Sequence, residues 1–90
     1  MNDIVRKAVA GTLESSDVFV QLEPNPDGLV IEIESVVMNQ FGDSIRRAVE
    51  ETLEAQGVRN VKLMLTDRGA LDCVIRARVE TAVVRGREEL

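Results

Sequence analysis

Histidine, tryptophan and tyrosine are absent from this sequence of 90 residues, and cysteine occurs once, as Cys73. Without histidine, the commonest general base and the commonest neutral metal ligand are missing, and one cysteine cannot build a zinc site. Catalysis would have to rest on carboxylates, serines and arginines. We therefore expect no catalytic residues and no metal site. A single cysteine also cannot close an internal disulfide, which favours a reducing compartment.

Runs of basic residues and long apolar segments are also missing. The net charge is -5, and Phe19 and Phe41 are the only aromatic residues. Phosphate backbones would be repelled and bases would find few stacking partners, so we expect no nucleic-acid partner. No apolar run approaches the roughly 20 residues that cross a bilayer, and the first residues lack the apolar centre of a secretory signal. We expect a cytoplasmic protein with no membrane partner.

What the sequence does contain is the mixture of an ordinary globular domain, with 44% hydrophobic and 30% charged residues. Such a mixture has enough apolar surface to fold. A chain of this length buries one modest core, which leaves little room for a deep active-site cavity. We expect a single domain over residues 1–90.

Two segments alternate apolar and polar residues with the period of a β-strand. Residues 17–23 form the first and residues 29–35 the second. The Pro-Asn-Pro-Asp-Gly link between them, residues 24–28, is rich in turn-forming residues. This arrangement predicts an antiparallel hairpin of the two strands.

Helical spacing follows from Met38 onward, where apolar residues recur every three or four positions. Ser35 is a candidate cap for this helix, and a later start near Asp43 is the alternative because Gly42 weakens the first turns. Gly57 followed by Val58 predicts a left-handed C-terminal cap. A further strand is predicted over residues 61–67, then a turn, and then a second helix over about residues 71–85.

The first 14 residues admit two interpretations. They can extend as a strand that pairs with residues 17–23, which places Ser15 and Ser16 at a hairpin tip, or form a short helix halted by Gly11. Ser15 is exposed in both. The expected fold class is α+β, a two-layer sandwich with a small, mostly antiparallel sheet of three to four strands and two helices packed on one face.

Three blocks of this sequence together resemble the acyl carrier protein, or γ subunit, of citrate lyase. They are AVAGTLESSDV at residues 8–18, QFGDSIRRAVEETL at residues 40–53 and GALDCVIRARVE at residues 69–80. Their order and spacing match the family, and with the strands between them they span nearly the whole chain. The resemblance also implies either glycine or serine at position 16.

The resemblance implies that Ser15 carries a covalent 2'-(5''-phosphoribosyl)-3'-dephospho-coenzyme A (dephospho-CoA) arm through a phosphodiester. Acetyl and citryl thioesters would form on this arm while citrate is cleaved to acetate and oxaloacetate. The implied partners are the α (transferase) and β (lyase) subunits of citrate lyase and a holo-forming transferase. This subunit would itself be non-catalytic.

The residues alone leave other interpretations open. The carrier of a malonate decarboxylase is one alternative, although its later blocks differ, and an interaction module without a cofactor is another. Glu14 and Asp17 are expected to be ordinary turn residues. Arg78 is expected to be a solvated charge or part of a docking patch, and Cys73 a small buried residue rather than a thioester carrier.

Overall fold

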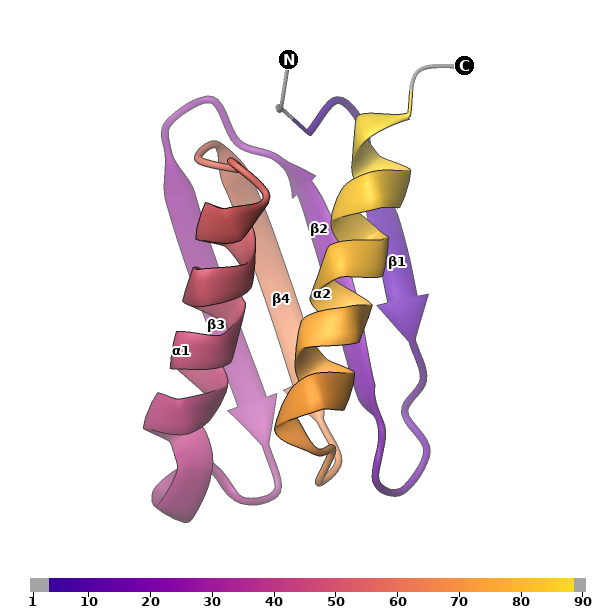
Figure 1. Ribbon diagram of the computed structural model, residues 1–90, viewed down its shortest axis with the longest axis vertical. Helices are drawn as coiled ribbons and strands as arrows, with labels where there is room; N and C mark the ends of the chain where they lie inside the picture. Colours follow the sequence, from indigo (N-terminus) through magenta and orange to yellow (C-terminus); the bar gives the residue numbers. More distant parts are fainter. Residues whose placement is uncertain (1–3, 89–90) are drawn as a thin grey trace.

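A computed structural model describes residues 4–88 of the chain as one mixed sheet with both helices on the same face (Figure 1). The predicted α+β two-layer architecture is confirmed. In chain order the elements are β1 (Ala8–Gly11), β2 (Val18–Pro24), β3 (Leu29–Ser35), α1 (Met38–Ala55), β4 (Val61–Asp67) and α2 (Asp72–Arg87).

The sheet has the order β1-β2-β4-β3, which corrects the predicted hairpin of β2 with β3. β4 lies between these two strands, antiparallel to β2 and parallel to β3. The physical reason is the crossover through α1, which returns the chain beside β3 in the same direction and makes a β-α-β unit. The link after β2 passes the start of β4, where Val61 N–H donates to the Gly28 carbonyl at 3.1 Å.

The core lies between the sheet and the helices. Every second residue of β4 is buried, and the same alternation occurs along β2, as the period of a strand requires. α1 and α2 cover this face. The fully buried side chains that meet there include Val18, Val20, Leu53, Leu63, Val79 and Val83.

The predicted end of α1 is confirmed. Gly57 has a φ of 70°, and Val58 N–H donates to the Leu53 carbonyl at 3.0 Å, which together form a left-handed cap with an apolar residue folding back. The start differs from both alternatives. The helix begins at Met38 rather than near Asp43, and the Ser35 hydroxyl accepts from Val37 N–H without capping the helix.

The N-terminal alternatives are also resolved. Ala8–Gly11 is a strand paired antiparallel with β2, so the short helix is wrong. The segment before it lies against the end of α2, where Val5 N–H donates to the Gly86 carbonyl at 2.8 Å. Among residues 4–88, no helix is long and apolar enough to cross a membrane.

Candidate functional site

Ser15 lies in the loop that joins β1 to β2, called here the 12–17 loop for its residues. In Figure 1 this loop lies at the end of the molecule opposite the chain termini, with the starts of both helices. Thr12 N–H closes the loop by donating to the Val18 carbonyl at 3.2 Å. The predicted placement of Ser15 at a hairpin tip is therefore confirmed.

Ser15 and Ser16 are the two central residues of a β-turn within this loop. Asp17 N–H donates to the Glu14 carbonyl at 3.1 Å, which defines the turn. Ser16 has a φ of 65°, the left-handed conformation that glycine adopts without cost, whereas Ser15 does not have a positive φ. A positive φ at the second central residue is the signature of a type II turn. The backbone therefore explains why glycine suits position 16.

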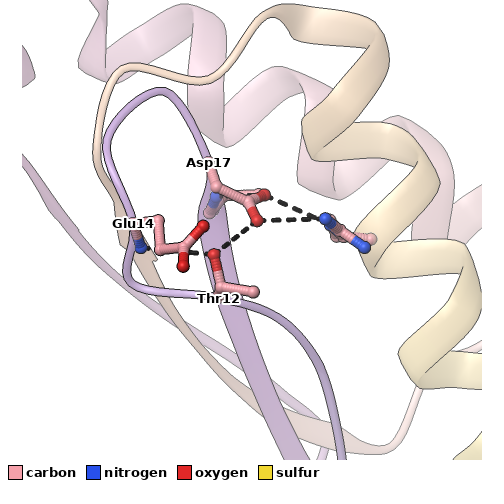
Figure 2. A network of polar contacts seen from close by, with 5 residues as sticks. Thr12, Glu14 and Asp17 are labelled. Carbon is pink, nitrogen blue, oxygen red and sulfur yellow. Dashed lines mark hydrogen bonds and ion pairs between the residues drawn. The ribbon is translucent and has the colours of Figure 1, made fainter.

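Asp17 holds this turn in place with both carboxylate oxygens. Its Oδ2 accepts from the Thr12 hydroxyl at 2.6 Å and its Oδ1 from Val18 N–H at 2.7 Å. The Arg78 guanidinium of α2 donates to both oxygens, at 3.2 and 3.0 Å. Figure 2 shows Asp17 pointing from the loop toward a helix, with Thr12 bridging Asp17 and Glu14. A bidentate arginine–carboxylate pair fixes orientation as well as distance.

The same contacts change the acidity of Asp17. Its pKa is lowered from 3.8 to about 2, chiefly by the hydrogen bond from Thr12, then by the bond from Val18 N–H, with a smaller contribution from Arg78. Only 15% of the Asp17 side chain is exposed. Donors that favour the charged form outweigh the cost of partial burial, so this carboxylate stays ionised at neutral pH.

Gly11 allows this arrangement to form. It has a φ of 89°, and an added Cβ would overlap the Val18 carbonyl oxygen and lie 3.3 Å from Arg78 Cδ. The arginine stem therefore lies over the glycine on its way to Asp17. A glycine at this position is required both by the backbone conformation and by the close approach of β2.

A second contact joins the 12–17 loop to the turn after β4. Ser16 N–H donates to the Arg68 carbonyl at 2.9 Å, and Arg68 N–H donates to the Asp17 carbonyl at 2.9 Å. The turn after β4, far away in sequence, thus holds the backbone that directly follows the exposed Ser15 side chain. The result is a primary hydroxyl presented on a fixed turn.

The residues around Ser15 fit a covalently attached group. Its side chain is exposed. Gly69, next to the Arg68 contact, has nothing within 4 Å of the place where a Cβ would lie, so the adjoining surface is open. Among residues 4–88, no group of three or more acidic or cysteine side chains could hold a metal ion. Cys73, expected to be buried, is exposed because it lies on the outer face of α2.

Comparison with known proteins gives the family. The profile of the malonate decarboxylase delta subunit (MdcD) family matches residues 5–86. The citrate lyase acyl carrier protein of Enterobacter sp. (strain 638) is 55% identical over 86 residues, covering 96% of this chain and 89% of that protein. That of Streptococcus uberis (strain ATCC BAA-854 / 0140J) is 51% identical over 83 residues, covering 92% and 82%. This chain belongs to the citrate lyase acyl carrier protein family.

The fold of this chain is similar to that of one chain in a solved multi-subunit complex. A chain in the crystal structure of a Pseudomonas malonate decarboxylase hetero-tetramer in complex with malonate superposes with a TM-score of 0.80. It is 26% identical in sequence, and the match covers 91% of this chain and 84% of that chain. As a member of the acyl carrier family, the chain is a carrier subunit rather than a catalytic one.

Sequence reasoning missed the support around Ser15. Asp17 was expected to be an ordinary turn residue and Arg78 a solvated charge, yet they form an ion pair across 61 residues of chain. The spacing of Gly11 and Thr12 before the serines was the available signal for an unusual turn. Nothing within residues 8–18 indicates which distant arginine pairs with Asp17.

Proposed function

We propose that this chain, as a single domain over residues 1–90, is the acyl carrier (γ) subunit of a citrate lyase, with its prosthetic group on Ser15. The family resemblance implies 2'-(5''-phosphoribosyl)-3'-dephospho-CoA, joined to the serine by a phosphodiester. Such a group supplies a thiol that holds acetyl and citryl residues as thioesters during the cleavage of citrate to acetate and oxaloacetate. The cytoplasm is the proposed location.

The observation that carries this proposal is the exposed Ser15 side chain on a turn that is fixed by contacts of Ser16 and Asp17 with Arg68 and Arg78. A holo-forming transferase needs a hydroxyl that it can reach and a backbone that it can recognise. The bonds from Thr12 and Arg78 to Asp17 hold that backbone in one shape. The α (transferase) and β (lyase) subunits would then receive the same arm in turn, because tethering raises its effective concentration at each site.

Ser15 rather than Ser16 is the proposed attachment residue. Ser16 occupies a left-handed position at which glycine is the favoured residue, and its N–H is already engaged by Arg68. A side chain that glycine can replace is poorly suited to carry an obligatory group. The geometry of the turn therefore supports the serine that the family motif also indicates.

The test is the intact mass of the protein after co-expression with the holo-forming transferase. Ser16→Ala should gain the full mass of the arm, and Ser15→Ala should gain none while keeping its circular dichroism spectrum. Peptide mapping should place the arm on Ser15 in the unaltered chain. An arm on Ser16 would contradict the attachment residue and leave the carrier function standing. An unmodified wild-type chain beside an active transferase would contradict the carrier function and favour an interaction module.

A further inference from the structure

An apolar groove of about 320 Å³ opens between the first turns of α1 and α2. The starts of α1 and α2, which line this groove, lie at the same end of the molecule as the 12–17 loop (Figure 1). The two features share one turn, because Ser16 and Asp17 bond to Arg68, and the next residue, Gly69, lines the groove. The edge of the groove at Gly69 therefore lies close to Ser16, the residue that follows Ser15.

The walls of this groove are mostly apolar, and several of its side chains remain open to solvent. Leu71 is 70% exposed and Phe41 is 51% exposed. Val37, Ile45, Ala70 and Ile75 complete the apolar walls. Apolar side chains gathered around a hollow, rather than scattered singly, are typical of a surface that binds something.

One buried carboxylate lies among the groove residues. Asp67 is 1% exposed, and its oxygens accept from the Ser35 hydroxyl at 2.8 Å and from Ala70 N–H at 2.9 Å. Asp72 adds a second carboxylate at the rim, where it pairs with Arg76. Because Asp67 is buried with both oxygens already bonded and Asp72 is paired, the groove offers a ligand mainly its apolar walls. An uncharged chain fits such walls better than a phosphate or a free acid, which would lose hydration there.

We infer that this groove binds the uncharged pantetheine segment of the arm attached to Ser15 and shelters its terminal thiol between transfers. The inference rests on the proposed function, since it requires the arm. The pantetheine lies at the far end of the arm, so the arm must fold back to reach the groove. Tethering then makes weak binding sufficient, because binding within one molecule has an effective concentration of up to about the millimolar range. The arm's phosphates stay outside, because a charged group would lose its hydration against apolar walls.

The experiment measures how fast iodoacetamide alkylates the arm thiol of the holo protein in a Cys73→Ser background. This background is needed because Cys73 is exposed and would react as well. We expect the wild-type groove to slow alkylation by about threefold or more relative to free coenzyme A. Backbone amide signals of Ala70, Leu71 and Ile75 should shift between apo and holo protein.

Two variants alter the groove without removing a core residue. Ser44→Leu fills it from an exposed position of α1, and Ala55→Leu, exposed on the same helix but away from the groove, is its matched control. Leu71→Ser removes one wall and places a favourable serine at the N-cap of α2, so folding should be preserved. Leu29→Ser, at an exposed leucine away from the groove, controls for it. Both groove variants should restore the alkylation rate of coenzyme A, and the controls should not.

Intact mass separates the two ways in which this can fail. If the arm is absent from Ser15, the proposed function fails and the inference fails with it. If the arm is present but its thiol reacts as fast as coenzyme A and the groove amides do not shift, the inference alone is overturned. It is also overturned if Ser44→Leu leaves alkylation unchanged while weakening co-purification with the transferase subunit, because the groove would then be a protein-docking site.

Discussion

The 12–17 loop and the loop of residues 25–28 turn the chain at opposite ends of β2, and different interactions hold them. In the 25–28 loop, Gly28 N–H donates to the Asn25 carbonyl and Asp27 N–H to the Asn25 side chain, both at 3.3 Å. Those bonds join near neighbours in sequence. The bond from Val61 N–H to the Gly28 carbonyl is a backbone contact with the start of β4, so no distant side chain within residues 4–88 holds this loop. The 12–17 loop instead depends on Arg78 of α2. A turn that only reverses the chain can be encoded locally, whereas a turn that presents Ser15 is fixed against the helical layer.

The largest expected effect is a difference in stability between alanine substitutions at two glycines, Gly11 before the 12–17 loop and Gly28 in the 25–28 loop. Gly11→Ala should destabilise the protein by about 3 kcal/mol or more, because the added Cβ overlaps the Val18 carbonyl and the left-handed φ adds strain. Gly28→Ala should cost only about 1–2 kcal/mol, since its φ of 121° is strained but nothing lies within 4 Å. Urea unfolding at neutral pH measures both. Equal losses would show that the two loops are not held differently.

The next effect is a pH dependence specific to the 12–17 loop. Because the Asp17 pKa falls from 3.8 unfolded to about 2 folded, its stabilisation is complete above the unfolded value and is lost as pH falls through the folded value. The full contribution is at most about 2 kcal/mol at this partly exposed site. Asp17→Asn should therefore be less stable at pH 7, and its deficit should shrink below pH 3.8 toward pH 2.

The control for this prediction is Asp27→Asn, which changes a carboxylate of the 25–28 loop. It should leave the pH dependence of unfolding close to that of the unaltered chain. Urea titrations at several values between pH 2 and pH 7 give the comparison. A pH-independent deficit in Asp17→Asn would mean that the carboxylate acts through its shape and not through its charge.

The smallest effect is a gain in stability at Ser16. Ser16→Gly should remove about 1–2 kcal/mol of left-handed strain from the folded state. Glycine also makes the unfolded chain more flexible, which lowers stability by about 0.4–1 kcal/mol. The net gain should lie between zero and about 1.6 kcal/mol. Each 1 kcal/mol raises the melting temperature of a chain of this size by about 4–8 °C. Scanning calorimetry detects such a shift. A lower melting temperature would argue that the Ser16 side chain supports the turn.

Much of the secondary structure could be predicted because its causes are local. Alternating residues marked β2, β3 and β4, and Gly57 with Val58 marked the end of α1. Strand pairing could not be predicted in the same way. The turn-rich link before Gly28 favoured a hairpin, but pairing is a competition between distant strands, and β4 gains partners on both sides by entering the middle of the sheet.

By itself, the sequence determined the α+β class, the exposure of Ser15 and the family to which the chain belongs. These depend on periodicity, on turn-forming residues and on the order and spacing of motifs along the chain, all of which can be read without the fold. Only the tertiary structure decided that Arg78 holds Asp17, that Cys73 is exposed and that a groove lies beside the serine turn. Each depends on which residues of different elements come into contact in the folded chain. The pattern of residues within one segment does not specify those contacts.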